Sequence, residues 1–171
     1  MIKRTVGLIV LTNTADRGLT AVLQVRGDFN TEKNNQETYR GACQLTVHGS
    51  INDGEDETDT LLRETREELG EEFAEIVEAE FNKDQNFVEL NRISTDDISV
   101  VNFGVIIDES ALKEIELNSS TGGSIRLISK SDVDNIRELK KTDRENGVPE
   151  DEVVMFPDDI EAVKLAFEKF S

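Results

Sequence analysis

Two short runs of apolar and β-branched residues stand close together near the start of the chain, and a polar turn separates them. The runs are residues 5–12 (TVGLIVLT) and 19–25 (LTAVLQV), and the turn between them holds Asn13, Asp16 and Gly18. Runs of this length and composition are typical of strands, and a short polar connection favours antiparallel neighbours. The sequence therefore predicts that the fold begins with an antiparallel strand pair. Further strands are expected at residues 42–47, 87–93, 99–107 and 124–128.

Helical spacing is clearest in residues 58–69. Apolar and β-branched residues recur there at intervals of three and four, with Thr58 as the expected N-cap and Gly70 as the expected end of the helix. A second strong pattern covers residues 157–170, where Pro157 opens a helix whose Ile160, Val163, Phe167 and Phe170 share one face. Weaker patterns predict a short helix at 110–115, a capped helix at 131–139 and either helix or irregular chain at 71–81. Residues 27–40 are polar and are expected to form a long loop.

Strands are thus interleaved with helices of unequal length, without a regular strand–helix–strand repeat. This order predicts an α/β (α+β) fold in which a mixed β-sheet is sandwiched between α-helices. The 171 residues, of which 36% are hydrophobic, are enough for one domain with a substantial core. We expect one domain over residues 1–171.

The charge of the chain limits the partners that it can bind. Thirty-seven acidic residues against nineteen basic ones give a formal net charge of −18. Such a surface repels nucleic-acid polymers and anionic membranes, whereas a small phosphorylated ligand remains compatible because a bound cation inverts the local field. The apolar stretch 5–11 is too short to span a membrane. A single cysteine, Cys43, excludes an intramolecular disulfide framework, so a cytoplasmic location is expected.

Three glutamates on the first predicted helix carry the chemistry. Glu64, Glu67 and Glu68 stand at positions that share a helix face. Like charges at this spacing destabilise an isolated helix by roughly 0.2–0.5 kcal/mol per pair, unless cations neutralise them. Carboxylate oxygens suit Mg²⁺ or Mn²⁺. The alternative interpretation is a solvated acidic face, which is common in Glu-rich helices.

The residues around these glutamates decide between the two interpretations. Gly49, Glu55, Arg63, Glu64, Glu67, Glu68 and Gly70 fall in register with the pattern Gly-x5-Glu-x7-Arg-Glu-U-x-Glu-Glu-x-Gly-U, where U is a bulky aliphatic residue. This segment resembles the Nudix box of the MutT-like hydrolases. Thr65 and Glu71 stand where the box has aliphatic residues, and His48-Gly49-Ser50 replaces a common Pro-Gly-Gly. Neither change removes one of the three glutamates.

The resemblance implies a Nudix fold and a metal-dependent pyrophosphohydrolase. Its substrate would be a nucleoside diphosphate linked to another moiety, and homodimers are common in similar families. Glu64, Glu67, Glu68 and the Gly49 carbonyl would hold Mg²⁺ or Mn²⁺, and Glu67 or Glu68 would orient the attacking water. Arg63 and Glu55 would pair and fix the helix against the preceding loop. The alternative is a non-catalytic Nudix-fold module that binds a nucleotide or a protein partner.

Other residues have both a functional and a purely structural interpretation. Many similar enzymes use a further carboxylate, for which Glu116, Glu150 and Glu152 are unranked candidates. His48 would contact substrate or simply end a strand, and Arg26 and Arg40 would meet phosphates or a carboxylate, or simply flank the polar loop.

Overall fold

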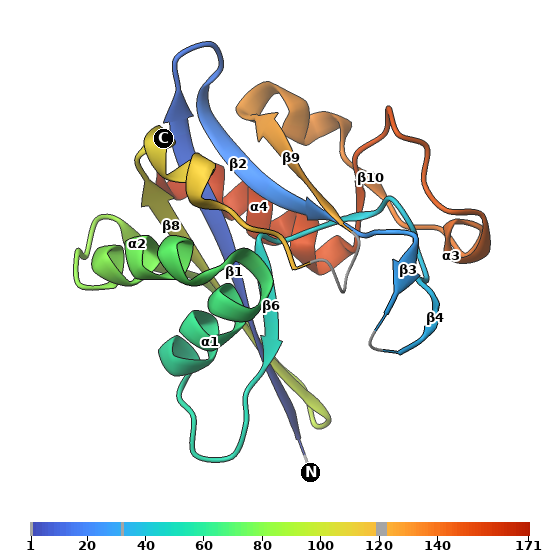
Figure 1. Cartoon of the computed structure of the whole chain (residues 1–171), viewed down its shortest axis with the longest axis horizontal. Coiled ribbons are helices and arrows are strands. Elements are labelled where there is room, and N and C mark those ends of the chain that lie inside the picture. Colours follow the sequence, from blue (N-terminus) through green and yellow to red (C-terminus); the bar gives the residue numbers. More distant parts are fainter. Residues whose placement is uncertain (1, 32, 119–122) are drawn as a thin grey trace.

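The computed structural model describes residues 2–31, 33–118 and 123–171. Its central element is a seven-stranded mixed sheet built around β1 (Lys3–Thr14) (Figure 1). β1 pairs in parallel with β8 (Ile98–Ile107) and antiparallel with β2 (Gly18–Val25), so the expected N-terminal antiparallel pair is confirmed. The remaining strands of this sheet are β5 (Cys43–Gln44), β6 (Val47–Ser50), β7 (Phe87–Ser94) and β9 (Ser124–Ser129).

One edge of β1 has two partners in succession. Its first half pairs with β6, with Thr5 opposite Ser50, and its second half pairs with β2, with Val10 opposite Val22. The sheet therefore forks along this edge, because β6 and β2 pair with the same side of β1 at different positions along its length. The predicted strand 42–47 is in fact two short strands, β5 and β6, which lie on the two sides of this fork.

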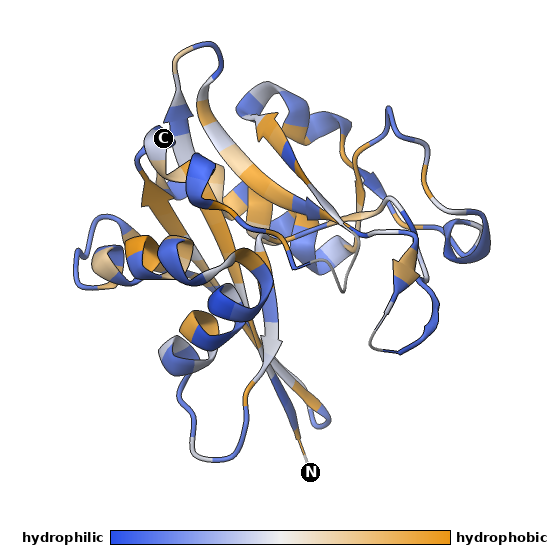
Figure 2. Ribbon diagram, viewed as in Figure 1, coloured by the Kyte–Doolittle hydropathy of each residue, from blue (hydrophilic) through white to orange (hydrophobic). Residues whose placement is uncertain are grey.

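Helices cover both faces of the sheet, as the sequence predicts (Figure 1). α1 (Glu57–Leu69) and α2 (Glu71–Phe81) lie on one face, and α4 (Pro157–Lys169) lies on the other. Side chains of β1 alternate between two buried clusters: Val6, Leu8 and Val10 pack with α1 and α2, whereas Ile9 and Leu11 pack with α4. The hydrophobic strands between these helices are visible in Figure 2. Burying each such aliphatic side chain contributes about 1.5–3 kcal/mol.

The ends of α1 are set by local chemistry. Gly70 ends the helix, as predicted, with a positive φ (φ 97°, ψ 160°) that glycine adopts without strain. The N-cap is Asp56 and not Thr58, because the Asp56 carboxylate accepts the backbone N–H of Asp59 at 2.8 Å and the helix begins at Glu57.

The helix predicted at 131–139 is wrong. The chain makes a 3₁₀ turn, Lys130–Asn135, and then the strand β10 (Arg137–Glu138), which pairs with β11 (Val154–Met155). Pairing with a distant strand thus overrides the local helical pattern. The helix predicted at 110–115 is also a 3₁₀ turn, the polar loop contains the small hairpin β3 (Phe29–Asn30) and β4 (Asn35–Gln36), and a short helix, α3 (Asp143–Asn146), was not foreseen. Across the described residues, no helix has the length and apolar character needed to cross a membrane.

Candidate functional site

α1 presents its three glutamates on one side while its other side packs on the sheet. Leu61, Thr65 and Leu69 are fully buried, which fixes the rotation of the helix. Glu64 and Glu68 consequently point toward the fork between β6 and β2, whereas the Glu67 side chain is 57% exposed. The helix face predicted from the spacing is therefore formed.

Gly49 lies directly against Glu64. A Cβ atom at this position would stand 2.2 Å from Cγ and 2.5 Å from Oε1 of Glu64, distances that real atoms do not adopt. Only glycine leaves room for the Glu64 carboxylate beside the β6 backbone. This contact gives a physical reason for the glycine at the start of the motif.

Arg63 joins the loop before the helix to the glutamate face. Its guanidinium forms a two-pronged ion pair with Glu55, at 2.8 Å (Nε to Oε1) and 3.0 Å (Nη2 to Oε2), and donates to the Ser50 carbonyl at 3.1 Å. Its Nη1 also contacts Glu64 at 2.7 Å and Glu67 at 3.4 Å. The hydrogen bond from Arg63 lowers the pKa of Glu55 to about 2. The structure therefore brings Arg63 and Glu55 together as the resemblance implies.

Glu68 is a partly buried carboxylate on the same helix face as Glu64. The Gln24 side-chain amide donates to it at 2.7 Å and also donates to the Thr46 carbonyl at 2.7 Å. Burial raises the pKa of Glu68 to about 7, against the effect of these hydrogen bonds. Within the described residues, no lysine or arginine forms an ion pair with Glu68. Burial also raises the pKa of Glu64, although Arg63 opposes that shift.

His48, just before Gly49, is held by the C-terminal helix. Its Nε2 lies 3.1 Å from Oδ1 of Asp159, which is in the first turn of α4 and is only 6% exposed. Burial by itself lowers the pKa of His48, but the hydrogen bond and the charge of Asp159 outweigh burial and raise it. Sequence reasoning missed both Asp159 and Gln24. The polar Gln24 inside an apolar strand was the one available signal, while nothing in the sequence linked Asp159 to the motif.

The donor atoms around Glu64 fit a hard divalent cation in their chemistry. Carboxylate and carbonyl oxygens are the ligands that Mg²⁺ and Mn²⁺ prefer, and the raised pKa values of Glu64 and Glu68 are the shifts that a nearby cation would reverse. The three carboxylates do not converge, however: among residues 2–31, 33–118 and 123–171, no group of three acidic, histidine or cysteine side chains is close enough to hold a metal. Arg63 Nη1 instead bonds both Glu64 and Glu67.

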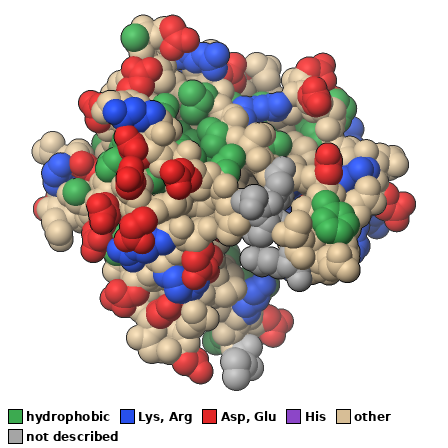
Figure 3. Space-filling view, in the orientation of Figure 1, with side chains coloured by type: hydrophobic (Ala, Val, Ile, Leu, Met, Phe, Trp, Pro, Cys, Tyr) green, Lys and Arg blue, Asp and Glu red, His purple; other side chains and the backbone are tan. Residues whose placement is uncertain are grey.

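A cavity of about 640 Å³ opens beside this site. It is bounded by the start of β1, the middle of α1, the end of β6 and the turn between β3 and β4, and its lining includes Lys3, Lys33, His48, Gly49, Arg63 and Glu64. Acidic side chains gather over α1 and α2, with Lys and Arg side chains beside them on the same face (Figure 3).

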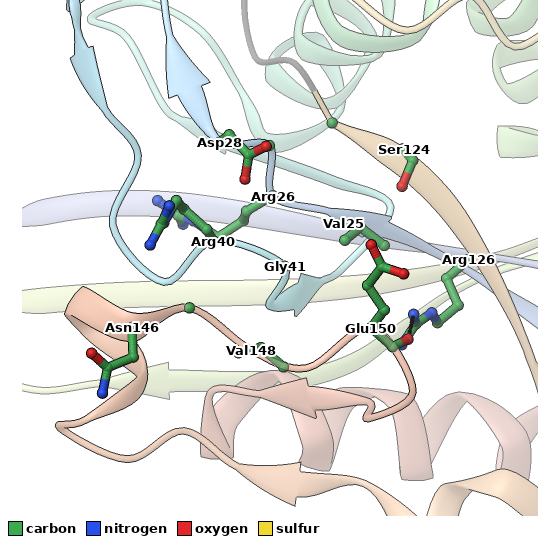
Figure 4. A pocket seen from close by; sticks show the side chains of 13 residues that line it. Val25, Arg26, Asp28, Arg40, Gly41, Ser124, Arg126, Asn146, Val148 and Glu150 are labelled. Atoms are coloured by element: carbon green, nitrogen blue, oxygen red, sulfur yellow. Dashed lines mark hydrogen bonds between the residues drawn. The ribbon is translucent and has the colours of Figure 1, made fainter.

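A second cavity, of about 530 Å³, lies where the polar loop 27–40 begins and ends. Arg26 and Arg40 lie on one side of it and Arg126 on the other, beside Glu150 (Figure 4). Of the other two candidate carboxylates, Glu152 pairs with Arg137 at 2.7 Å, and Glu116 lies next to Gly70 at the end of α1. None of the three candidates is thereby singled out as a further ligand.

No protein-family model matches the sequence, and no curated protein matches it either. Solved structures do resemble the fold. A mutT/nudix family protein from Listeria innocua superimposes with a TM-score of 0.60 at 16% identity, over 97% of this chain and 92% of that one. The NUDIX domain of Shewanella oneidensis NrtR, solved in complex with ADP ribose, gives 0.59 at 16% identity, over 100% and 90% of the two chains.

A MutT/nudix family protein from Enterococcus faecalis also gives a TM-score of 0.59, at 19% identity, over 99% of this chain. This chain spans 62% of the length of the Enterococcus protein. Identities this low carry no residue roles, but the likeness extends over nearly all of the chain in each case. The protein therefore has the Nudix fold that its glutamate motif predicts.

Proposed function

We propose that this protein is a pyrophosphohydrolase that uses Mg²⁺ or Mn²⁺ to hydrolyse a nucleoside diphosphate linked to another moiety. The observation that carries the proposal is the partly buried Glu68 carboxylate, which shares a helix face with Glu64 and forms no ion pair with a lysine or arginine among the described residues. Desolvating a carboxylate without a counter-ion costs several kcal/mol. A cation that binds on this face would remove that cost.

Each residue of the site has a definite task in this proposal. Glu64, Glu67, Glu68 and the Gly49 carbonyl would hold the cation, which would supply charge neutralisation at the diphosphate and a lowered pKa for a water molecule. Arg63 and Glu55 keep α1 in position against the loop. Gln24 fixes the orientation of the Glu68 carboxylate.

The reaction adds one water molecule across the phosphoric anhydride. The water oxygen forms a bond to one phosphorus while the bond from that phosphorus to the bridging oxygen breaks. The bridging oxygen leaves with the other phosphate, and Glu67 or Glu68 accepts the proton from water. The class of substrate is supported by the Shewanella NUDIX domain, which was solved with ADP ribose, a nucleoside diphosphate derivative.

A panel of diphosphate compounds tests the proposal with the wild type, Glu67→Gln and Glu68→Gln in the presence of Mg²⁺ or Mn²⁺. Turnover should depend on the metal and should fall by about 100-fold or more in both variants, because each removes a ligand charge. Glu75→Gln is the matched control, since Glu75 is an exposed glutamate of α2 outside the motif. An equal loss in Glu75→Gln, or turnover that survives removal of the metal by a chelator, would refute this mechanism.

A second candidate function is a Nudix-fold module that binds a nucleotide without hydrolysing it. The observation that favours it is the position of Arg63 Nη1, which bonds both Glu64 and Glu67 and thereby neutralises part of the glutamate face without a metal. Tight binding of ADP ribose in calorimetry, together with no turnover on any panel compound, would favour this module over the enzyme.

A further inference from the structure

We propose that Lys3 and Lys33 bind an additional phosphate group of the substrate in the cavity beside Gly49 and Glu64. This inference rests on the proposed function and deepens it, because it names the preferred substrates. These are diphosphate compounds that carry a further phosphate, such as nucleoside triphosphates, and not compounds whose diphosphate is their only anionic group.

The two lysines reach one cavity from distant parts of the chain. Lys3 begins β1, while Lys33 lies in the turn between β3 and β4. The turn is anchored locally, since the Lys33 backbone N–H donates to the Asn30 side chain at 3.0 Å and Asn34 adopts a left-handed conformation (φ 48°). The hairpin therefore directs Lys33 toward the cavity that Glu64 also lines.

The cavity has more basic than acidic residues in its lining, although the whole chain carries a formal charge of −18. Its lining contains three cations, Lys3, Lys33 and Arg63, against one carboxylate, Glu64. Arg63 is already committed to Glu55, Glu64 and Glu67. Within the part of the chain that the structure describes, Lys3 and Lys33 form no ion pair or side-chain hydrogen bond. The two ammonium groups are thus free to meet a ligand.

The arginine-lined cavity of Figure 4 offers a contrast. Arg26 pairs with Glu37 at 2.6 Å, and Arg40 donates to the Glu145 carbonyl at 3.1 Å. Arg126 donates to two backbone carbonyls of the segment before β11. These three arginines have partners within the protein and hold the chain together, which makes the lysine pair the better site for a ligand anion.

The chemistry of an ammonium group fits a phosphate. Lysine presents a compact, strongly hydrated charge with three donors, and a cleft lined by one sign of charge concentrates ligands of the opposite sign. In the proposed function, the cation on the glutamates neutralises the diphosphate that reacts. The two lysines are therefore available for a further group. Lys33 also lines an adjoining cavity of about 150 Å³ with Gln24 and Arg26, so it lies on the boundary between two spaces.

Binding of non-hydrolysable analogues tests the inference without turnover. Calorimetry with Mg²⁺ would compare a methylene-bridged nucleoside diphosphate with the corresponding methylene-bridged triphosphate. We expect wild type to bind the triphosphate more tightly, and Lys3→Gln and Lys33→Gln each to weaken triphosphate binding by about tenfold with little effect on the diphosphate. Lys164→Gln is the control, because it removes the same charge from the exposed face of α4.

Steady-state kinetics provides the second arm, with a nucleoside triphosphate and a sugar nucleotide as substrates. The lysine variants should raise KM for the triphosphate and leave kcat and the sugar nucleotide unchanged. If neither substrate is turned over but the binding preference depends on Lys3 and Lys33, the anion site stands and the proposed hydrolase fails. If turnover occurs and the lysine variants behave like Lys164→Gln, the hydrolase stands and this inference is overturned. Failure of wild type to bind either analogue would also overturn it.

Discussion

Gly49 leaves the space that the Glu64 side chain occupies, and a short distance between the two residues shows this directly. In Gly49→Ala, the new Cβ atom would stand 2.2 Å from Glu64 Cγ, and the flexible glutamate can rotate away from it more easily than the strand can shift. We expect a loss of stability of only about 1 kcal/mol, together with a marked loss of metal affinity, because Glu64 leaves its place.

Titration with Mn²⁺ and thermal unfolding of the same variant measure the two effects of Gly49→Ala separately. Gly54→Ala serves as the control, since a Cβ at Gly54 meets no atom within 4 Å and any cost there comes from its positive φ of 87°. Metal affinity equal to wild type in Gly49→Ala would contradict the role assigned to this contact.

Gly70 shows how one residue divides two elements. It ends α1 and precedes α2 with φ 97° and ψ 160°, a region that is essentially open to glycine alone. In Gly70→Ala, a Cβ would also stand 3.2 Å from Cβ of Glu116. We expect a loss of about 1–3 kcal/mol in the free energy of unfolding, measured by urea denaturation. Stability equal to wild type would mean that the α1–α2 junction is able to relax into another conformation.

The short strands β10 and β11 are joined to α3 by an ion-pair network. Arg137 donates to both oxygens of Asp143, at 2.9 and 3.3 Å, and pairs with Glu152 at 2.7 Å. The hydrogen bonds from Arg137 lower the pKa of Asp143 below its usual value. Because the pKa is lower in the folded state, this contribution to stability is present above the unfolded pKa and is lost as the pH falls through the folded pKa.

We therefore expect Asp143→Asn to be less stable than wild type at pH 7 and the difference to shrink below about pH 4. Urea denaturation at a series of pH values measures this difference. Asp84→Asn, at an exposed aspartate in the turn before β7, is the comparison variant. A difference that stays constant down to the lowest pH would show that the Asp143 charge contributes nothing to the network.

At the scale of the whole molecule, the sequence predicts the sheet, its covering helices and the glutamate face of α1. These features depend on local periodicity and on the spacing of residues such as Glu64 and Glu68, which a sequence displays directly. Thr58 was wrongly predicted as the N-cap because Asp56, two residues earlier, offers a better-placed acceptor.

Features that depend on tertiary pairing were not predictable. β10 forms because it pairs with β11, with Arg137 opposite Val154. His48 likewise contacts Asp159, which is 111 residues later in the sequence. The cavity shared by Lys3 and Lys33 arises in the same way, since it requires the hairpin and the start of β1 to meet. The cavity that we propose to select the substrate therefore depends on tertiary contacts that the sequence does not display.

The excess of acidic groups should make stability depend on salt. The chain has a formal charge of −18, so its acidic groups repel one another in the compact folded state. Salt screens this repulsion beyond about 10 Å at 0.1 M ionic strength. Salt also weakens favourable pairs such as Arg92 with Glu57, but exposed pairs of that kind contribute only about 0–1 kcal/mol each. The repulsion should outweigh them because acidic residues outnumber basic ones nearly twofold.

We expect the midpoint of urea denaturation to rise between about 10 mM and 500 mM NaCl, with a chelator present to exclude divalent ions. A variant with Glu75→Lys and Glu109→Lys, both at exposed positions, should be more stable than wild type at low salt and should gain less from added salt. KCl at equal ionic strength should act like NaCl if screening is the cause. A midpoint that falls with salt in wild type would mean that ion pairs, and not self-repulsion, dominate the electrostatics of this fold.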